Sequence, residues 1–233
     1  MRIHAFGDVH AQYFKLKRLV DRLFIQKDDL LVFVGDYIDR GDHAFEVIEY
    51  LLKLKEKHNC VFLKGNHEAM LMDYMTGIHE RLWIQNGGLA TTESYYRNGW
   101  KMGRNRHYLR REMPRSHIEF YQNLKLYHET EDYIFVHAAL WPQEGLPLEN
   151  QPEDIILWER KHFIESDFDW GKKVIFGHTS FQKPFVMANK IGIDTGACYD
   201  PAYGGGNLTC ATLPDETFLS QGAVLDELEA LDD

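Results

Sequence analysis

Five short polar clusters follow apolar runs of the chain, and their residue types can bind metal ions. The clusters are Asp8-Val9-His10, Asp36 with Asp39-Arg40, Asn66-His67-Glu68, His137 and His178. Because the set combines carboxylates with imidazoles and contains no cysteine, it suits first-row divalent cations such as Mn²⁺, Fe²⁺ or Zn²⁺. A site for Mg²⁺ or Ca²⁺ would use oxygen ligands almost alone.

A glycine stands directly before four of the five clusters, where it lets the backbone turn sharply off a strand and lets a ligand approach closely. These residues are Gly7, Gly35, Gly65 and Gly177. A single aspartate such as Asp8 or Asp36 has a simpler explanation, because it can cap the helix that follows. The repetition of one arrangement along the chain favours a shared site over separate helix caps.

The clusters need elements that bring them together, and the apolar pattern predicts parallel strands. The first half alternates short apolar runs with segments of helical spacing, which is typical of a βαβα unit. The expected strands are 3–6, 30–34, 61–63, 134–136 and 174–176, with helices at 12–25 and 43–57. Ligands bind outside the carboxyl ends of the strands in an open α/β sheet, so parallel pairing would bring the clusters to one edge.

The rest of the chain predicts a helical stretch and a β-rich end. Residues 70–123 are rich in aromatic and basic side chains with few strand signals, so we expect a helical insert there. Residues 185–219 are expected to form a β-meander with strands at 191–193, 208–213 and 217–219. No proline- or serine-rich linker interrupts the sequence, which favours one catalytic domain over residues 1–222 and an acidic tail at 223–233.

The overall composition argues against several classes of protein. The 233 residues carry 36 acidic and 26 basic side chains and a formal charge of −10, which is unsuited to nonspecific nucleic-acid binding. No apolar run is long enough to cross a bilayer and no leader peptide opens the sequence, so we expect a cytoplasmic protein without a membrane partner. The three scattered cysteines show no disulfide or zinc-knuckle spacing, which fits a reducing compartment.

Three of the clusters resemble the signature motifs of the phosphoprotein phosphatase family. Residues 7–10 (GDVH), 35–41 (GDYIDRG) and 65–68 (GNHE) follow in order its GDxHG, GDxxDRG and GNHE motifs, and 137–139 and 177–179 look like its later metal-binding motifs. With segments 83–88, 158–160 and 193–197, the chain from about residue 1 to 213 is similar to the bacteriophage-lambda-like and bacterial branch of serine/threonine phosphatases. The resemblance implies an α/β fold, a calcineurin-like metallophosphoesterase β-sandwich with two mixed sheets flanked by helices.

The resemblance also implies two metal sites that share one aspartate. Asp8 and His10 would hold the first ion; Asn66, His137 and His178 would hold the second; and Asp36 would bridge both. The ions are expected to be Mn²⁺, with Fe and Zn as alternatives. The sequence departs from the family at Ala11, Ala138 and Ala139, where glycines are usual, and these departures bear on fine geometry because none of the three is a ligand.

Further residues are implied to act on the substrate. Arg40 and Arg160 would clamp phosphate oxygens, since a planar guanidinium fits two of them at once. His67 would protonate the leaving group as a general acid, oriented by Asp39. Asn66 and Tyr203 complete the expected substrate-binding set, Tyr203 on a glycine-rich loop at 197–206 that resembles an active-site wall. A basic segment at 97–115 is interpreted as a solvated helix face more readily than as a rim for phosphopeptides.

The expected activity is metal-dependent hydrolysis of phosphomonoesters by in-line attack of a metal-bridging hydroxide. Phosphoserine and phosphothreonine in proteins are the favoured substrates. The alternative is a dinucleoside polyphosphate hydrolase of the diadenosine tetraphosphate type. The symmetrical branch of those enzymes tends to carry alanine in place of Asp39 and GNHD in place of GNHE, which favours the protein phosphatase, whereas other diadenosine-cleaving relatives retain the Asp-Arg pair and keep the alternative open. A third hypothesis, a non-catalytic phosphopeptide-binding module, predicts a missing ligand or acid, and the motifs lack neither.

Overall fold

The computed structural model describes residues 1–100 and 111–223 and contains two five-stranded sheets. The first sheet has the order β10-β9-β1-β2-β3. Its parallel half consists of β1 (Ile3–Phe6), β2 (Leu30–Phe33) and β3 (Asn59–Phe62), joined by α1 (Tyr13–Asp21) and α2 (Ala44–Lys55). On the other side of β1, β9 (Leu208–Leu213) and β10 (Thr217–Gln221) add antiparallel strands.

The second sheet is mixed in the same way, with the order β4-β5-β6-β8-β7. Three neighbouring strands are parallel: β5 (Tyr133–Val136), β6 (Lys173–Phe176) and β8 (Lys190–Gly192). The short strands β4 (Tyr127–Glu129) and β7 (Phe185–Val186) pair antiparallel at its two edges.

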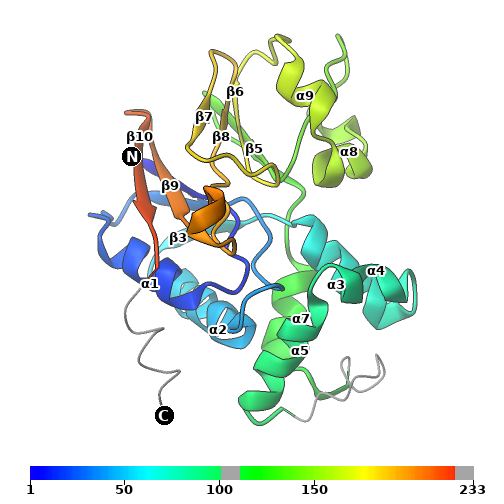
Figure 1. The fold of residues 1–233 in the computed structure, drawn as a ribbon. Coiled ribbons are helices and arrows are strands. Elements are labelled where there is room, and N and C mark those ends of the chain that lie inside the picture. Colours follow the sequence, from blue (N-terminus) through cyan, green and yellow to red (C-terminus); the bar gives the residue numbers. More distant parts are fainter. Residues whose placement is uncertain (101–110, 224–233) are drawn as a thin grey trace.

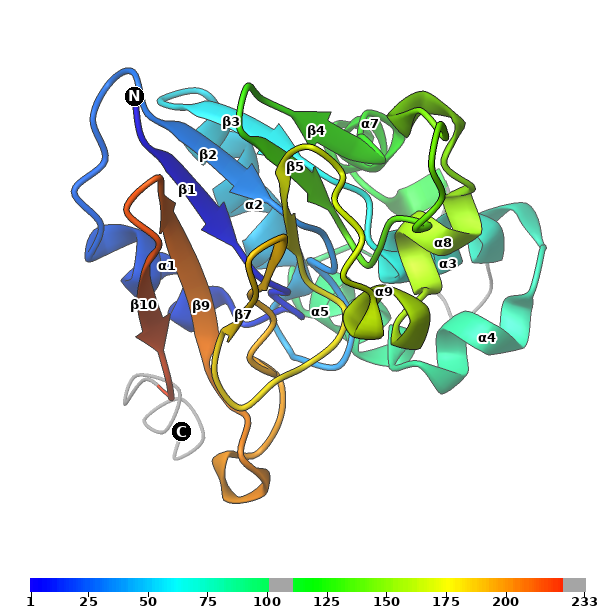
Figure 2. The same cartoon turned by 90° about the horizontal axis from the view of Figure 1, so that it is seen from above.

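Alternation of side chains along the strands builds separate apolar layers. Ile3 and Val32 of the first sheet share one buried cluster with Phe135 and Ile175 of the second, so the two sheets pack against each other. Phe33 directly follows Val32 in β2, so its side chain points to the opposite face of the sheet, where it packs with α1 and α2. Figures 1 and 2 show the resulting order of layers: helices α1 and α2, the first sheet, the second sheet, and the short helices α8 (Glu153–Trp158) and α9 (Lys161–Glu165).

The expected helical segment is present and lies beside α2 (Figure 1). It contains α3 (Asn66–Thr76), α4 (Glu80–Gln85), α5 (Gly88–Arg97) and α7 (Arg115–Gln122). Buried side chains of these helices, such as Met70, Tyr95 and Phe120, join the same cluster as α1, α2 and the first sheet. Two short 3-10 helices, η1 (Leu148–Asn150) and η2 (Pro201–Tyr203), lie in loops.

The expected α/β fold with two mixed sheets flanked by helices is confirmed, and one local expectation is wrong. Residues 185–219 do not form a single meander, because β7 and β8 belong to the second sheet whereas β9 and β10 belong to the first. The strands β4 and β7 were not expected; they are three and two residues long, too short for a clear period. Residues 101–110 of the basic segment and 224–233 of the acidic tail lie outside the described residues. Within the described residues, no helix is long and apolar enough to cross a membrane.

Candidate active site

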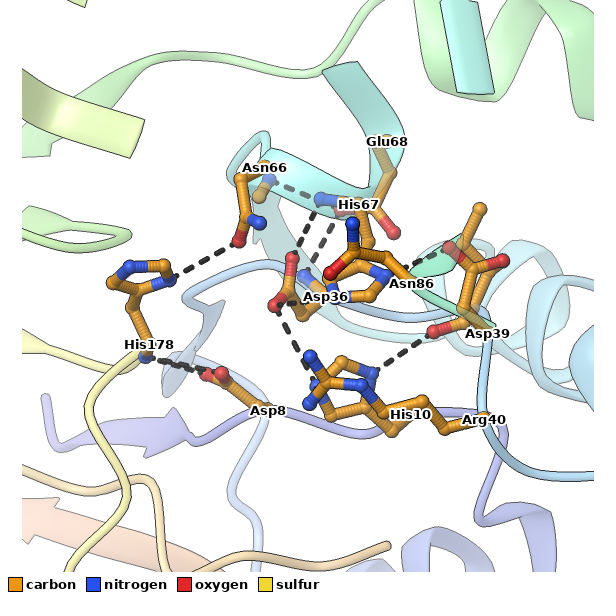
Figure 3. Close-up of polar contacts among 12 residues, drawn as sticks. Asp8, His10, Asp36, Asp39, Arg40, Asn66, His67, Glu68, Asn86 and His178 are labelled. Carbon is orange, nitrogen blue, oxygen red and sulfur yellow. Dashed lines mark hydrogen bonds and ion pairs between the residues drawn. The ribbon is translucent and has the colours of Figure 1, made fainter. Parts of the chain in front are cut away.

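The five polar clusters meet at the carboxyl ends of strands from both sheets. Three of them follow β1, β2 and β3, and the histidines of the other two follow β5 and β6. Because the two sheets pack face to face, the ends of these strands lie close together (Figure 3). The sequence led us to expect all five clusters at the edge of one sheet, but the strands that carry them belong to two sheets. Several non-glycine residues here have positive φ, which costs energy and is typical of functional sites. They are His10, Ala11, Asp36, Asp39, Arg40 and His178.

The hydrogen bonds of two histidines determine which ring nitrogen faces the centre. His10 Nδ1 lies 3.0 Å from the carbonyl oxygen of Ile38, and His137 Nδ1 lies 2.9 Å from that of Val34. A carbonyl only accepts, so in both rings Nδ1 donates its proton and Nε2 keeps a lone pair. His137 Nε2 lies 2.9 Å from Asn66 Oδ1, and His178 Nδ1 lies 3.1 Å from the same oxygen.

These histidines favour the neutral state. Burial lowers the pKa of His10 to about 3 and that of His178 to about 2, and it also lowers the pKa of His137. The lone pair of His137 Nε2 therefore points at Asn66 Oδ1, which also carries lone pairs, and a cation bound by both atoms would remove the repulsion between them. Imidazole nitrogen with carboxylate and amide oxygen is the ligand set of a first-row divalent cation, so the residues fit such an ion.

Asp36 lies between two groups of potential ligands. Its Oδ2 is 3.6 Å from His10 Nε2, whereas its Oδ1 is 3.5 Å from His137 Nε2. The ligand atoms of His10, Asp36 and His67 lie within 4.8 Å of one another, as do those of Asp36, His137 and His178, and all five residues are buried. One carboxylate thus faces both groups, with one oxygen toward each, which is the geometry that a bridging ligand needs.

Asp8 is brought to the site but does not join either group. Its carboxylate oxygens accept the backbone N–H of His178 at 3.0 and 3.2 Å (Figure 3). Burial, with the nearby charges of Asp194 and Asp36, raises the pKa of Asp8 well above its usual value. In the first group the structure places His67 where the sequence led us to expect Asp8.

The backbone around Asp36 is held by Glu68 at the start of α3. Glu68 Oε2 accepts the N–H groups of Asp36 and Gly65 at 2.9 and 3.0 Å, and Oε1 accepts that of Tyr37 at 2.8 Å. The N–H of His67 donates to Asp36 Oδ1 at 3.0 Å. A Cβ on Gly65 would lie 2.1 Å from that oxygen, so only glycine allows the two loops to approach this closely.

His67 and Asp39 form a buried pair beside Asp36. His67 Nδ1 lies 2.7 Å from Asp39 Oδ2, and His67 Nε2, 4.0 Å from Asp36 Oδ2, has no hydrogen-bond partner among the described residues. Burial by itself lowers the pKa of His67, but the carboxylates of Asp36 and Asp39 outweigh it and the net shift is upward. The pair therefore presents a polarised ring whose free nitrogen faces the centre.

Arg40 contacts the first group of potential ligands directly. Arg40 Nη1 lies 3.0 Å from His10 Nε2 and donates to Tyr199 Oη at 3.4 Å, so a guanidinium supplies the positive charge that the His10 lone pair faces. Arg160 is exposed. Burial is the main reason why the pKa values of His137 and His178 are low, and the positive charge of Arg160 makes a smaller contribution in the same direction. Tyr203 ends η2, and its side chain lies outside the described part of the chain.

Two buried residues of the helical segment were not assigned to the site from the sequence. Trp83 Nε1 donates to both oxygens of Asp39, at 2.9 and 3.1 Å, and Thr91 Oγ1 donates to Asp39 Oδ1 at 2.6 Å. An indole or a hydroxyl in a helix is ordinarily a packing residue, so the residue types alone carry no signal of this contact. Only the position of Trp83 within the segment that resembles the phosphatases pointed toward it.

Comparison with known proteins agrees with this geometry. The model of the calcineurin-like phosphoesterase family matches residues 1–189. The asymmetrical bis(5'-nucleosyl)-tetraphosphatase PrpE of Halalkalibacterium halodurans is 26% identical, with 94% of this chain and 93% of the relative covered. Serine/threonine-protein phosphatase 2 of Escherichia coli is 28% identical, with coverages of 84% and 87%. A crystal structure of a candidate diadenosine tetraphosphatase has a TM-score of 0.70 at 22% identity, covering 96% and 94%, which supports the fold.

The family match spans most of the chain and includes all five polar clusters. The histidines and aspartates of those clusters are positioned to bind metal ions. This chain belongs to the calcineurin-like phosphoesterases, a family of metal-binding phosphoester hydrolases.

Proposed function

We propose that the chain is a serine/threonine protein phosphatase that uses two divalent metal ions, with Mn²⁺ as the expected ion. In this account His10 and Asp8 would hold one ion, Asn66, His137 and His178 would hold the other, and Asp36 would contribute to both. Bound at these residues, the ions supply Lewis acidity and lower the pKa of a coordinated water from about 15.7 toward 7.

The remaining site residues bind the phosphoryl group and move a proton. Arg40 and Arg160 each present a planar guanidinium to two phosphate oxygens, which orients the group and balances its charge. His67 donates a proton from Nε2 to the oxygen of the leaving alcohol. Asp39 accepts the hydrogen bond from His67 Nδ1, which fixes the ring and favours its protonated state.

The buried His67–Asp39 pair is the observation that supports a phosphomonoester of an alcohol as the substrate. The alkoxide of serine or threonine is a strongly basic leaving group and needs a proton as the bond to phosphorus breaks. A nucleotide phosphate is a stable anion and leaves without one. His67 and Asp39 are fully buried, with His67 Nδ1 2.7 Å from Asp39 Oδ2. A histidine held in this way is suited to protonate the alkoxide of serine or threonine.

A dinucleoside polyphosphate is the second candidate substrate, because the PrpE relatives match the chain over 90–94% of its length. The arginines that bind a phosphomonoester would also bind a polyphosphate. The two candidates differ in what they require of His67, and that difference can be measured.

The experiment compares a phosphothreonine peptide, a phosphotyrosine peptide and diadenosine tetraphosphate as substrates of the wild type and of His67→Asn, each with added Mn²⁺. A protein phosphatase should turn over the phosphothreonine peptide best and should lose roughly 100-fold or more in kcat on it when His67 is replaced. Preference for diadenosine tetraphosphate, with little change in His67→Asn, would support the second candidate. Loss of bound metal in His67→Asn would instead make His67 a ligand and contradict its acid role.

A further inference from the structure

The loop that carries Asp39 and Arg40 is strained and is held from the helical segment. Both residues have positive φ, 68° and 69°, a conformation that non-glycine residues keep only when their surroundings enforce it. The N–H of Asp39 donates to Thr91 Oγ1 at 3.0 Å, and the N–H of Arg40 donates to the carbonyl oxygen of Gly87 at 3.4 Å. Helix α5 and the turn before it therefore fix the backbone of both residues.

The same segment fixes the carboxylate of Asp39. Thr91 Oγ1 accepts the Asp39 N–H and at the same time donates its own proton to Asp39 Oδ1 at 2.6 Å. Trp83 Nε1 donates to Oδ2 at 2.9 Å and to Oδ1 at 3.1 Å. With His67 Nδ1 at 2.7 Å, the carboxylate has three donors, and all four side chains are fully buried. Rotation of the carboxylate would break at least one of these bonds.

The position of Trp83 depends in turn on Gly88. A Cβ on Gly88 would lie 2.3 Å from two atoms of the indole ring, so the ring lies directly on the glycine backbone. Gly87, at φ 100°, makes the turn that brings its carbonyl to Arg40. Gly88 therefore acts on Asp39 through Trp83, and Gly87 bonds directly to the backbone of Arg40.

We propose that Trp83 and Thr91 are positioning residues for proton transfer by His67. They hold the Asp39 carboxylate so that Oδ2 meets His67 Nδ1, and His67 Nε2 then faces the centre, 4.0 Å from Asp36 Oδ2. This inference rests on the proposed function, because it assumes a leaving group that receives a proton. It makes helices α4 and α5 part of the active site.

The test uses substitutions that remove hydrogen bonds while preserving volume. Thr91→Val removes the hydroxyl, Thr91→Ser retains it, and Trp83→Phe removes the indole N–H. Thr92→Val is the matched control, because Thr92 is the buried neighbour whose hydroxyl, among the described residues, bonds within its own helix to the Gly88 carbonyl at 3.4 Å. For each variant, kcat is measured with p-nitrophenyl phosphate, a good leaving group, and with phenyl phosphate, a poor one, and bound Mn²⁺ per chain is determined.

Thr91→Val and Trp83→Phe should reduce kcat on phenyl phosphate by about tenfold or more, with less than about a threefold change on p-nitrophenyl phosphate and unchanged metal content. Thr91→Ser should return kcat to within about threefold of wild type, and Thr92→Val should resemble wild type. Adding Thr91→Val to His67→Asn should change kcat by less than about twofold, because both act through the same proton donor. If Thr91→Val does not fold, Trp83→Phe and the double variant built on it provide the same test.

Equal losses on the two esters, loss of metal, or a leaving-group-dependent loss in Thr92→Val would overturn the inference. Its failure is distinguishable from failure of the proposed function. A wild type that hydrolyses neither ester with Mn²⁺ refutes the function. A wild type that is active, with a leaving-group-dependent loss in His67→Asn and none in Thr91→Val, refutes the positioning role alone.

Discussion

Glu68 holds Asp36 through the main chain: its Oε2 accepts the Asp36 N–H at 2.9 Å, and the same carboxylate also accepts the N–H groups of Tyr37 and Gly65. The position of Asp36 between the two groups of potential ligands therefore depends on Glu68, which belongs to neither group. The family motif GNHE contains this glutamate, and the structure provides a physical reason for it.

Glu68→Gln should destabilise the fold. The amide of glutamine has only one accepting oxygen, so one of the buried N–H groups now bonded to Oε1 and Oε2 loses its acceptor. The cost is about 2 kcal/mol, within the range for a buried donor that is left without an acceptor. Urea unfolding of chelated protein measures it without a contribution from metal binding. Glu119→Gln, which breaks an exposed ion pair with Arg115, is the control and should change stability by less than about 0.5 kcal/mol. Equal effects of the two substitutions would contradict the role of Glu68.

Asp36→Asn should remove most metal binding, because an amide replaces the carboxylate that faces both ligand groups. Activity with Mn²⁺ should fall by roughly 100-fold or more, since even residues behind the ligands contribute 10- to 100-fold to metal affinity. Elemental analysis after dialysis gives the metal content. Asp42→Asn, an exposed aspartate in the same loop, should bind metal as the wild type does. Near-normal metal content in Asp36→Asn would count against the bridge.

Gly177→Ala should weaken metal binding by crowding Asp8. The new Cβ would lie 2.1 Å from Asp8 Oδ1 and 2.8 Å from a methyl carbon of Val34, so the carboxylate has to move. Metal affinity should fall by about 10- to 100-fold in a Mn²⁺ titration. Gly222→Ala is the comparison, because its nearest contact is a side-chain oxygen at 3.2 Å. Wild-type affinity in Gly177→Ala would show that the Asp8 carboxylate moves freely and has no fixed place at the site.

Acid should destabilise the fold through His4, whose contacts are with Thr212 and Asp29 and not with the metal residues. Burial lowers the pKa of His4 below its usual 6.5, so the unfolded chain takes up a proton first as the pH falls. The stabilising contribution is therefore present above pH 6.5 and is lost as the pH falls through it. The free energy of unfolding of wild type and His4→Asn, measured at several values between pH 7.5 and 5.5, should fall more steeply for the wild type. Parallel slopes would mean that His4 takes up its proton equally in both states.

The position of the strands before four of the five clusters could be predicted, because a glycine and a polar residue interrupt the apolar run there. The start of β1 at Ile3 and the end of β6 at Phe176 agree with the expectation. The sheet to which each later strand belongs could not be predicted. Ile191 pairs with Ile175 in one sheet and Ala211 pairs with Ala5 in the other, yet both strands are short apolar runs that follow the same period.

The site was predictable to the extent that its residues belong to contiguous motifs. The partners of Asp39 were not, because Trp83 is 44 residues and Thr91 is 52 residues away from it, on helices whose placement depends on tertiary packing. The contact of Asp8 with the His178 amide, across 170 residues, is of the same kind. The motifs in the sequence identify which residues can bind metal ions or transfer protons. Packing between distant parts of the chain determines which of these residues are in contact.

The central claim is that Asp36 joins two metal ions, one beside His10 and the other beside His137 and His178. Crystals grown with Mn²⁺ and measured at the manganese absorption edge test it most directly. The account predicts two anomalous peaks about 3.5–4 Å apart, one near His10 Nε2 and one near His137 Nε2 and His178 Nδ1, with one Asp36 oxygen toward each. A single peak, or peaks away from these nitrogens, would contradict it.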